Sequence, residues 1–134
     1  MGIFSFLTKK VGEKTADYWT GYGLKNLEEE NFEKAIKAFN EVIKLYQVEG
    51  YTNPIWREDL KQYLHNIYIA FLGLSLAHAA LNNFIPADDN YRKVKTLIKN
   101  YQSPNAKDFL KRMKLDKLIG LVDRIENHKF KSHF

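Results

Sequence analysis

The chain has 134 residues, of which 45% are hydrophobic and 28% charged, with a formal net charge of +5. This length fits one domain, and the lack of cysteine excludes disulfides, thiolate nucleophiles and cysteine-based zinc sites. The mild positive charge is carried mostly by lysine rather than arginine, which argues against nucleic acid as a partner.

The first ten residues, MGIFSFLTKK, bear on where the protein works. They lack a basic segment followed by an apolar core of signal-peptide length, so we expect a cytoplasmic protein. They also place apolar side chains beside lysines, as in a short amphipathic anchor. A peripheral protein that uses its N-terminus on a membrane surface is therefore the alternative reading.

The first half of the chain predicts two helices. Apolar side chains near one stripe favour a helix over about residues 4–29. A second helix is predicted over about residues 32–46, where apolar residues recur at three- and four-residue steps after Asn31, a plausible N-cap.

The second half predicts three more helices. Pro54 can open a helix of about 28 residues, and another follows Pro86 to about Asn100. The last spans about residues 104–126, and the basic segment 127–134 follows as a frayed tail. Because the links are short, we expect an all-α fold of antiparallel helical hairpins in one domain over residues 1–126.

The third helix contains the run IYIAFLGLSLAHAAL, residues 67–81, which has no charged side chain. A membrane-spanning helix needs about 20 apolar residues. This run is shorter and is closed by Asn82 and Asn83. It therefore predicts a central helix that is apolar on all faces, rather than a membrane span.

Two helix pairs carry similar residues at the same offsets, 52 residues apart. Each pair has an aromatic residue, a small residue one turn later, an aromatic near the turn, and then a small and an aromatic residue in the second helix. The two sets are Trp19, Gly23, Phe32, Ala35 and Phe39, and Phe71, Ser75, Phe84, Ala87 and Tyr91. Small residues let helices approach closely while aromatic rings fill the space around them.

This pattern resembles the tetratricopeptide repeat (TPR) family over about residues 16–49 and 68–101. The resemblance implies TPR-like hairpins, an extended third helix and a C-terminal capping helix. The chain departs from the family pattern at Asn26 and His78, where an aromatic residue is common. Its repeats are also further apart than the family's usual 34 residues.

The resemblance further implies a protein–protein interaction module, an adaptor or assembly factor, that binds through a concave groove. The family's groove positions correspond to apolar residues in both pairs: Leu24, Leu27, Ile69, Leu72, Leu76 and Ala79. Asp17 and Thr20 also fall on this side, and Thr20 and Leu24 take the places of the Lys and Asn that would clamp a chaperone tail. Such a groove either accepts a partner helix or peptide, or is covered by the protein's own first residues or a second copy.

The polar motifs do not indicate catalysis. His65 and His78 lie about 140° apart around their helix and cannot share a metal, and the chain has no phosphate loop or nucleophile elbow. We therefore expect no enzyme, no catalytic residue, no metal and no cofactor, with His78 hydrogen-bonded in the core.

One charged face remains on the predicted last helix. Lys107, Lys111 and Lys114 fall within about 60° of each other. They form either a solvated face or an electrostatic contact with an acidic protein, a lipid headgroup or a nucleic acid.

Overall fold

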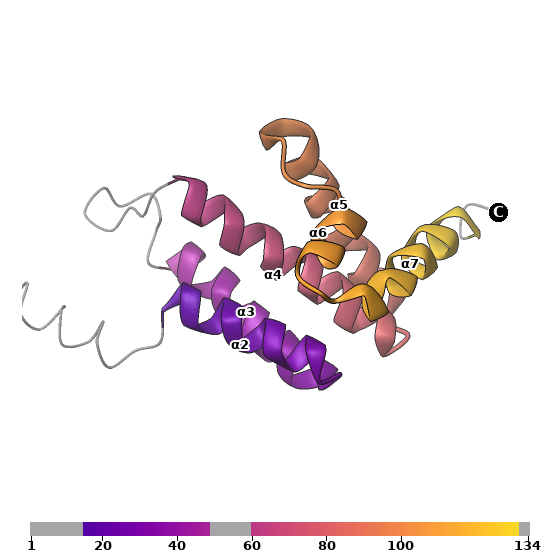
Figure 1. The fold of residues 1–134 in the computed structure, drawn as a ribbon, viewed down its shortest axis with the longest axis horizontal. Helices are drawn as coiled ribbons and strands as arrows, with labels where there is room; N and C mark the ends of the chain where they lie inside the picture. The colour runs from indigo at the N-terminus through magenta and orange to yellow at the C-terminus, as the bar shows by residue number, and fades with distance from the viewer. Residues whose placement is uncertain (1–14, 49–59, 132–134) are drawn as a thin grey trace, which may run out of the picture.

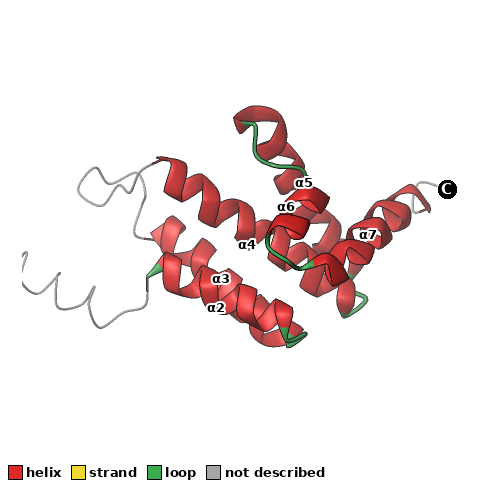
Figure 2. Cartoon of the chain, in the orientation of Figure 1, coloured by secondary structure: helices red, strands yellow, loops and turns green. Residues whose placement is uncertain are grey.

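The computed structural model describes residues 15–48 and 60–131, and all regular structure in these two segments is helical (Figures 1 and 2). The all-α prediction is confirmed. The elements, in chain order, are α2 (Ala16–Glu28), α3 (Phe32–Val48), α4 (Leu60–Ala80), α5 (Phe84–Tyr101), α6 (Ala106–Arg112), the short 3-10 helix η1 (Asp116–Leu118) and α7 (Ile119–Lys131).

The helices α2 and α3 form one hairpin, and α4 and α5 form a second. Each hairpin turns through a residue with left-handed backbone, Glu30 at φ 60° and Asn82 at φ 63°. The amide of Asn31 donates to the carbonyl of Asn26 at 2.8 Å, and the amide of Asn83 donates to that of His78, also at 2.8 Å. Both turns are therefore the Schellman ending of a helix, repeated 52 residues apart.

Phe39 of α3 joins the two hairpins. A Cβ atom added at Gly23 of α2 or at Gly73 of α4 would overlap the Phe39 ring. The two glycines therefore let one aromatic ring lie between α2 and α4, and the ring is fully buried there.

The helix α4 is enclosed on several sides. Its Asn66 side chain donates to the Tyr46 hydroxyl of α3 at 3.0 Å, and its Tyr68 ring packs edge-to-face on Phe109 of α6 at 5.2 Å. On a third side, the Lys93 ammonium of α5 lies over the ring of Phe71. Because these contacts point in different directions around the helix, α4 is the centre of the fold.

The C-terminal part differs from its prediction as one helix over 104–126. The helix α6 ends at Arg112, Lys114 has left-handed backbone at φ 60°, and the amide of Leu115 donates to the carbonyl of Leu110 at 2.8 Å. This third Schellman ending turns the chain so that the apolar residues after it are buried. Those residues are Leu115, Leu118, Val122 and Ile125. The last helix then runs to Lys131, past the predicted end at 126.

The first helix also differs from its prediction over 4–29. The helix α2 begins at Ala16, because Thr15 has extended backbone and its side chain accepts a hydrogen bond from the amide of Tyr18 at 3.2 Å. The rest of that prediction, and the proposed membrane anchor in residues 1–10, lie outside the described residues. So do residues 54–59 of the predicted third helix.

The apolar run 67–81 lies within and just after α4. None of the described helices, α4 included, has the length and apolar character needed to cross a membrane.

Candidate partner-binding cleft

A cleft of about 650 Å³ lies between the first half of α4 and the connection from α5 to α6. In Figure 1 the start of α4 and the end of α5 diverge on this side of the molecule. The residues that shape it are Leu64, His65 and Tyr68 of α4, Tyr101 and Pro104 of the connection, and Phe109 of α6.

Tyr68 and Phe109 form a fixed floor. The Tyr68 hydroxyl donates a hydrogen bond to the carbonyl of Pro104 at 2.6 Å, and both rings are nearly fully buried. Burial raises the pKa of Tyr68 well above its usual range, so the hydroxyl stays protonated and keeps this donor. The two rings therefore close the bottom of the cleft, and the Tyr68 hydroxyl already has its hydrogen-bond partner.

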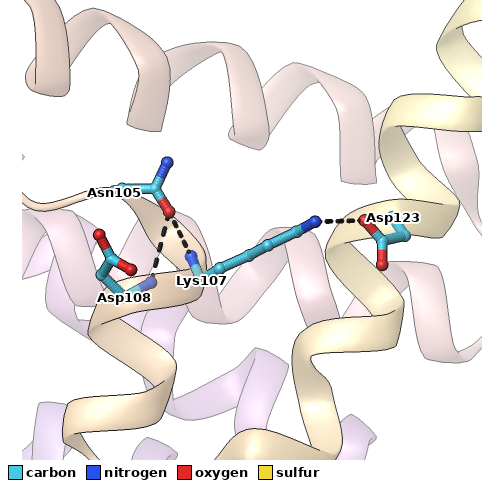
Figure 3. Close-up of polar contacts among 4 residues, drawn as sticks. All are labelled: Asn105, Lys107, Asp108 and Asp123. Atoms are coloured by element: carbon cyan, nitrogen blue, oxygen red, sulfur yellow. Dashed lines mark hydrogen bonds and ion pairs between the residues drawn. The ribbon is translucent and has the colours of Figure 1, made fainter.

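The position of Phe109 depends on how α6 is held. Figure 3 shows the Asn105 side chain accepting hydrogen bonds from the amides of Lys107 and Asp108, at 2.9 and 3.3 Å. This N-cap fixes where α6 begins. The Lys107 ammonium then reaches Asp123 of α7 at 2.6 Å, and this hydrogen bond raises the pKa of Lys107 (Figure 3).

The rim of the cleft is more exposed than its floor. Tyr101 is 54% exposed, His65 is exposed, and Leu64 is half-buried. Lys61, Gln62 and Gln102 add polar groups. Among the described residues that line the cleft there is one imidazole and no carboxylate, so they do not supply an acid–base pair. In the described segments, no group of three His, Cys, Asp or Glu residues could hold a metal ion.

The predicted groove residues lie elsewhere, in the core. Leu27, Ile69, Leu72, Leu76 and Ala79 are at most 2% exposed, and Leu24 is half-buried against them. Of the two alternatives, an open groove and a covered one, this burial fits the covered one, with the protein's own helices as the cover.

The direction in which each α4 side chain points explains why these residues are buried. At about 100° per residue, Leu72 and Ala79 lie on the side of Tyr68, which meets α6. Ile69 and Leu76 lie between that side and the side of Gly73, which meets the first hairpin. A partner on these residues would have to displace α6 and α7 or the first hairpin.

The segment α6–α7 is also tied to both hairpin turns. The Lys117 ammonium donates to the carbonyl of Glu28 and lies 3.9 Å from the Glu30 carboxylate. The Arg124 guanidinium donates to the Asn82 side chain at 2.7 Å. These contacts hold the C-terminal segment against the two hairpins, which keeps the predicted groove closed.

Of the two polar groove positions, Asp17 has side-chain hydrogen bonds, whereas the Thr20 hydroxyl has no partner among the described residues. Asp17 accepts hydrogen bonds from Gln62 at 2.7 Å and from Asn66 at 2.6 Å, which ties α2 to α4. Thr20 is buried.

The three lysines predicted on one helix face are separated. Lys107 is paired with Asp123, Lys111 is in the last turn of α6, and Lys114 follows the end of that helix in the left-handed turn. The prediction of one face is wrong for Lys114 because α6 stops before it.

His78 is partly buried, as a core residue would be. Its buried Nδ1 atom has no hydrogen-bond partner among the described residues, which differs from the expected hydrogen-bonded core histidine.

The comparisons with known proteins give no family for this chain. No family model, no curated protein and no solved structure matches it.

The cleft itself was not found from the sequence. Two features of the sequence bear on it: Tyr68 carries a hydroxyl inside an apolar run, and the loop YQSPNA contains Pro104 and the helix cap Asn105. Neither feature shows that the loop and α4 lie together, because that contact joins residues 36 apart in sequence.

Proposed function

We propose that this protein is a protein–protein interaction module, TPR-like in its stacked hairpins, and that it binds a peptide segment of a partner in the cleft between α4 and the α5–α6 connection. The observation that carries this proposal is the cleft itself, with its fixed aromatic floor and exposed rim. Sites of this kind combine apolar surface with a few polar groups that orient a ligand.

The TPR-like part of the proposal rests on repeated geometry. Both hairpins end their first helix with the same left-handed turn, at Glu30 and at Asn82. The Phe39 ring packs against Gly23, and this close contact supports the role that the resemblance gives to a small residue at that position. The pair α6 and α7 would then serve as the cap of the stack.

A peptide suits the lining better than a reaction does. Above the closed floor, Leu64 and Tyr101 can contact an apolar side chain, and Gln102 on the rim offers a side-chain donor to a backbone carbonyl. The cleft volume of about 650 Å³ lies within the range of about 300–1,000 Å³ that is usual for ligand-binding clefts. We therefore propose a binding role rather than catalysis, with a partner protein as the ligand.

Photocrosslinking can test this proposal. A benzophenone amino acid in place of Tyr101, on the rim, is expected to capture a discrete partner in the source cells. The same group in place of Lys37, exposed on α3, serves as the control. Equal capture from both positions would contradict the cleft as the site.

The purified partner then gives a quantitative test. Tyr101→Ala is expected to weaken its affinity by about tenfold or more, since truncating an aromatic anchor typically costs about 2 kcal/mol. Lys37→Ala is expected to leave the affinity unchanged. An unchanged Kd for Tyr101→Ala, in a variant with an unchanged melting temperature, would disprove the proposed site.

A further inference from the structure

The stacking of the two hairpins uses one face of α4, which we call the Gly73 face: Ala70, Gly73, Leu74 and Ala77. All four residues are buried. Gly73 meets the ring of Phe39 from α3, so the face receives a helix that carries an aromatic side chain.

Two contacts fix the direction of α3 on this face. Asn66 contacts Tyr46, and seven residues further along α4, Gly73 contacts Phe39, which is seven residues earlier on α3. The two helices are therefore antiparallel, and the same register places Ala77 opposite Ala35. Both alanines are fully buried, as this pairing requires.

The first hairpin presents the equivalent face on α2, 52 residues earlier. This Gly21 face consists of Tyr18, Gly21, Tyr22 and Lys25. Tyr18 is 43% exposed, Tyr22 is 37% exposed, and a Cβ atom added at Gly21 would meet nothing within 4 Å. The face that is buried in the second hairpin is thus not covered at Gly21 by any described residue of the first.

Aromatic side chains border the space at Gly21. The rings of Tyr18 and Tyr22 are nearly parallel, with centroids 6.1 Å apart, and Trp19 meets both edge-on at 5.2 and 6.0 Å. Such rings supply large apolar contact area with little conformational freedom to lose. The Gly21 face is therefore an ordered aromatic surface with a gap in it.

We propose that the Gly21 face docks an amphipathic α-helix of a partner protein, in the way that the Gly73 face receives α3. An aromatic side chain of that helix packs at Gly21, and a carboxylate one turn closer to its N-terminus pairs with Lys25. This second surface is separate from the cleft, so the proposal does not depend on the peptide site.

The chemistry of the partner follows from the register. Gly21 takes the place of Gly73, so the partner needs an aromatic residue where α3 has Phe39. Lys25 is exposed and takes the place of Ala77, so an acidic residue fits where α3 has Ala35. A helix docked on this face would pack on α2 in the same way that α3 packs on α4.

A second copy of this chain does not offer such a helix. Its own Phe39 and Val42 are fully buried inside its hairpins, so α3 is not available without unfolding. At the other end of the stack, Tyr91, the counterpart of Phe39, is only 7% exposed, and α7 packs on α5 there. The helix α3 of a second copy is therefore not the occupant, and the exposed Lys25 beside Gly21 favours an acidic, aromatic-bearing helix of another protein.

The probe for this surface is a fluorescein-labelled peptide of residues 32–48 with the substitution Ala35→Glu. We expect saturable binding to the full chain by fluorescence anisotropy. Gly21→Leu is expected to weaken binding by about tenfold or more, because its side chain fills the gap that the Phe39 ring of the peptide needs. Lys25→Glu is expected to weaken the binding of this peptide but not the binding of the peptide that keeps Ala35.

Gly120→Leu is the matched control. Gly120 is exposed on α7 and also has nothing within 4 Å of an added Cβ, so leucine fits at either glycine. We expect both variants to keep the wild-type circular dichroism spectrum and a melting temperature no lower than that of the wild type, and only Gly21→Leu to lose the peptide.

Three results would overturn the proposal. The first is no saturable binding of the peptide, and the second is binding that Gly21→Leu leaves unchanged. The third is a dimer in light scattering that Gly21→Leu dissociates, which would assign this face to a second copy.

Discussion

The first helices of the two hairpins, α2 and α4, occupy equivalent places in the repeat but have different surroundings. The helix α4 has a hairpin on one side and α6 and α7 on another, and twelve of its residues are buried. The helix α2 buries four: Thr20, Gly23, Asn26 and Leu27. Position in the stack, rather than position in the repeat, determines how apolar each helix must be.

This difference explains the sequences of the two helices. In α4, Ala70 and Ala77 pack against a neighbour, and a charged residue there would be buried without a partner. The equivalent positions in α2 are Tyr18 and Lys25, both exposed. Three changes at equivalent positions test the comparison.

Truncating the equivalent leucines to alanine should give the largest difference between α4 and α2 in the loss of unfolding free energy. Leu76 of α4 is fully buried, and Leu76→Ala is expected to lower the free energy of unfolding by about 3–4 kcal/mol. Leu24 of α2 is half-buried, so Leu24→Ala is expected to cost about 1–2 kcal/mol. Urea unfolding followed by circular dichroism measures both. Equal losses would show that the two helices are not as different as their burial indicates.

Substituting the equivalent glycines with alanine should change the stability of the protein in opposite directions. Gly73→Ala places a methyl group against the Phe39 ring and is expected to destabilise the protein by about 1–2 kcal/mol, despite the helix preference of alanine. Gly21→Ala meets open space and is expected to stabilise it by about 0.5–1 kcal/mol.

A double variant serves as the control for this pair. Phe39→Leu shortens the side chain next to Gly73, so in that background Gly73→Ala should cost less than in the wild type. A Gly73→Ala variant as stable as wild type would contradict the close approach of α3 to α4.

The smallest expected effect concerns the polar residues Asn26 and His78. The Asn26 amide donates to the carbonyl of Tyr22 at 2.8 Å, whereas the buried Nδ1 of His78 has no partner among the described residues. Burial lowers the pKa of His78 below the ordinary 6.5. The unfolded chain therefore binds a proton at a higher pH than the folded protein does.

Stability linked to His78 is consequently complete above about pH 6.5 and falls as the pH drops below that value. We expect His78→Leu to reduce the loss of unfolding free energy between pH 7.5 and 5.5, measured by urea titration at each pH. An identical pH dependence in the variant would show that His78 is protonated equally in both states.

The sequence predicted the helical framework because that framework is encoded locally. The apolar periodicity indicated the helices of both hairpins, and the turns lie where that periodicity is interrupted. The run 67–81 correctly indicated a central helix without a polar face. The break after Arg112 was missed because RMKLDK contains neither glycine nor proline, and Lys114 adopts a backbone conformation that lysine rarely takes.

The candidate sites depend on contacts that no local pattern encodes. The groove residues were placed correctly on the helices, but the sequence does not show that α6 and α7 return to cover them. The cleft requires the hydrogen bond from Tyr68 to Pro104, which joins two separate helical regions. The Gly21 face becomes visible only when the surroundings of equivalent residues are compared.

The place of Phe39 has a consequence for folding. Its ring contacts Gly23 and Gly73 together, so neither hairpin completes its packing before the other is present. Repeat proteins can lose their end units one at a time when each unit contacts its neighbour only along a surface. Here one shared side chain connects the units, and we expect the described helices to unfold in a single cooperative transition.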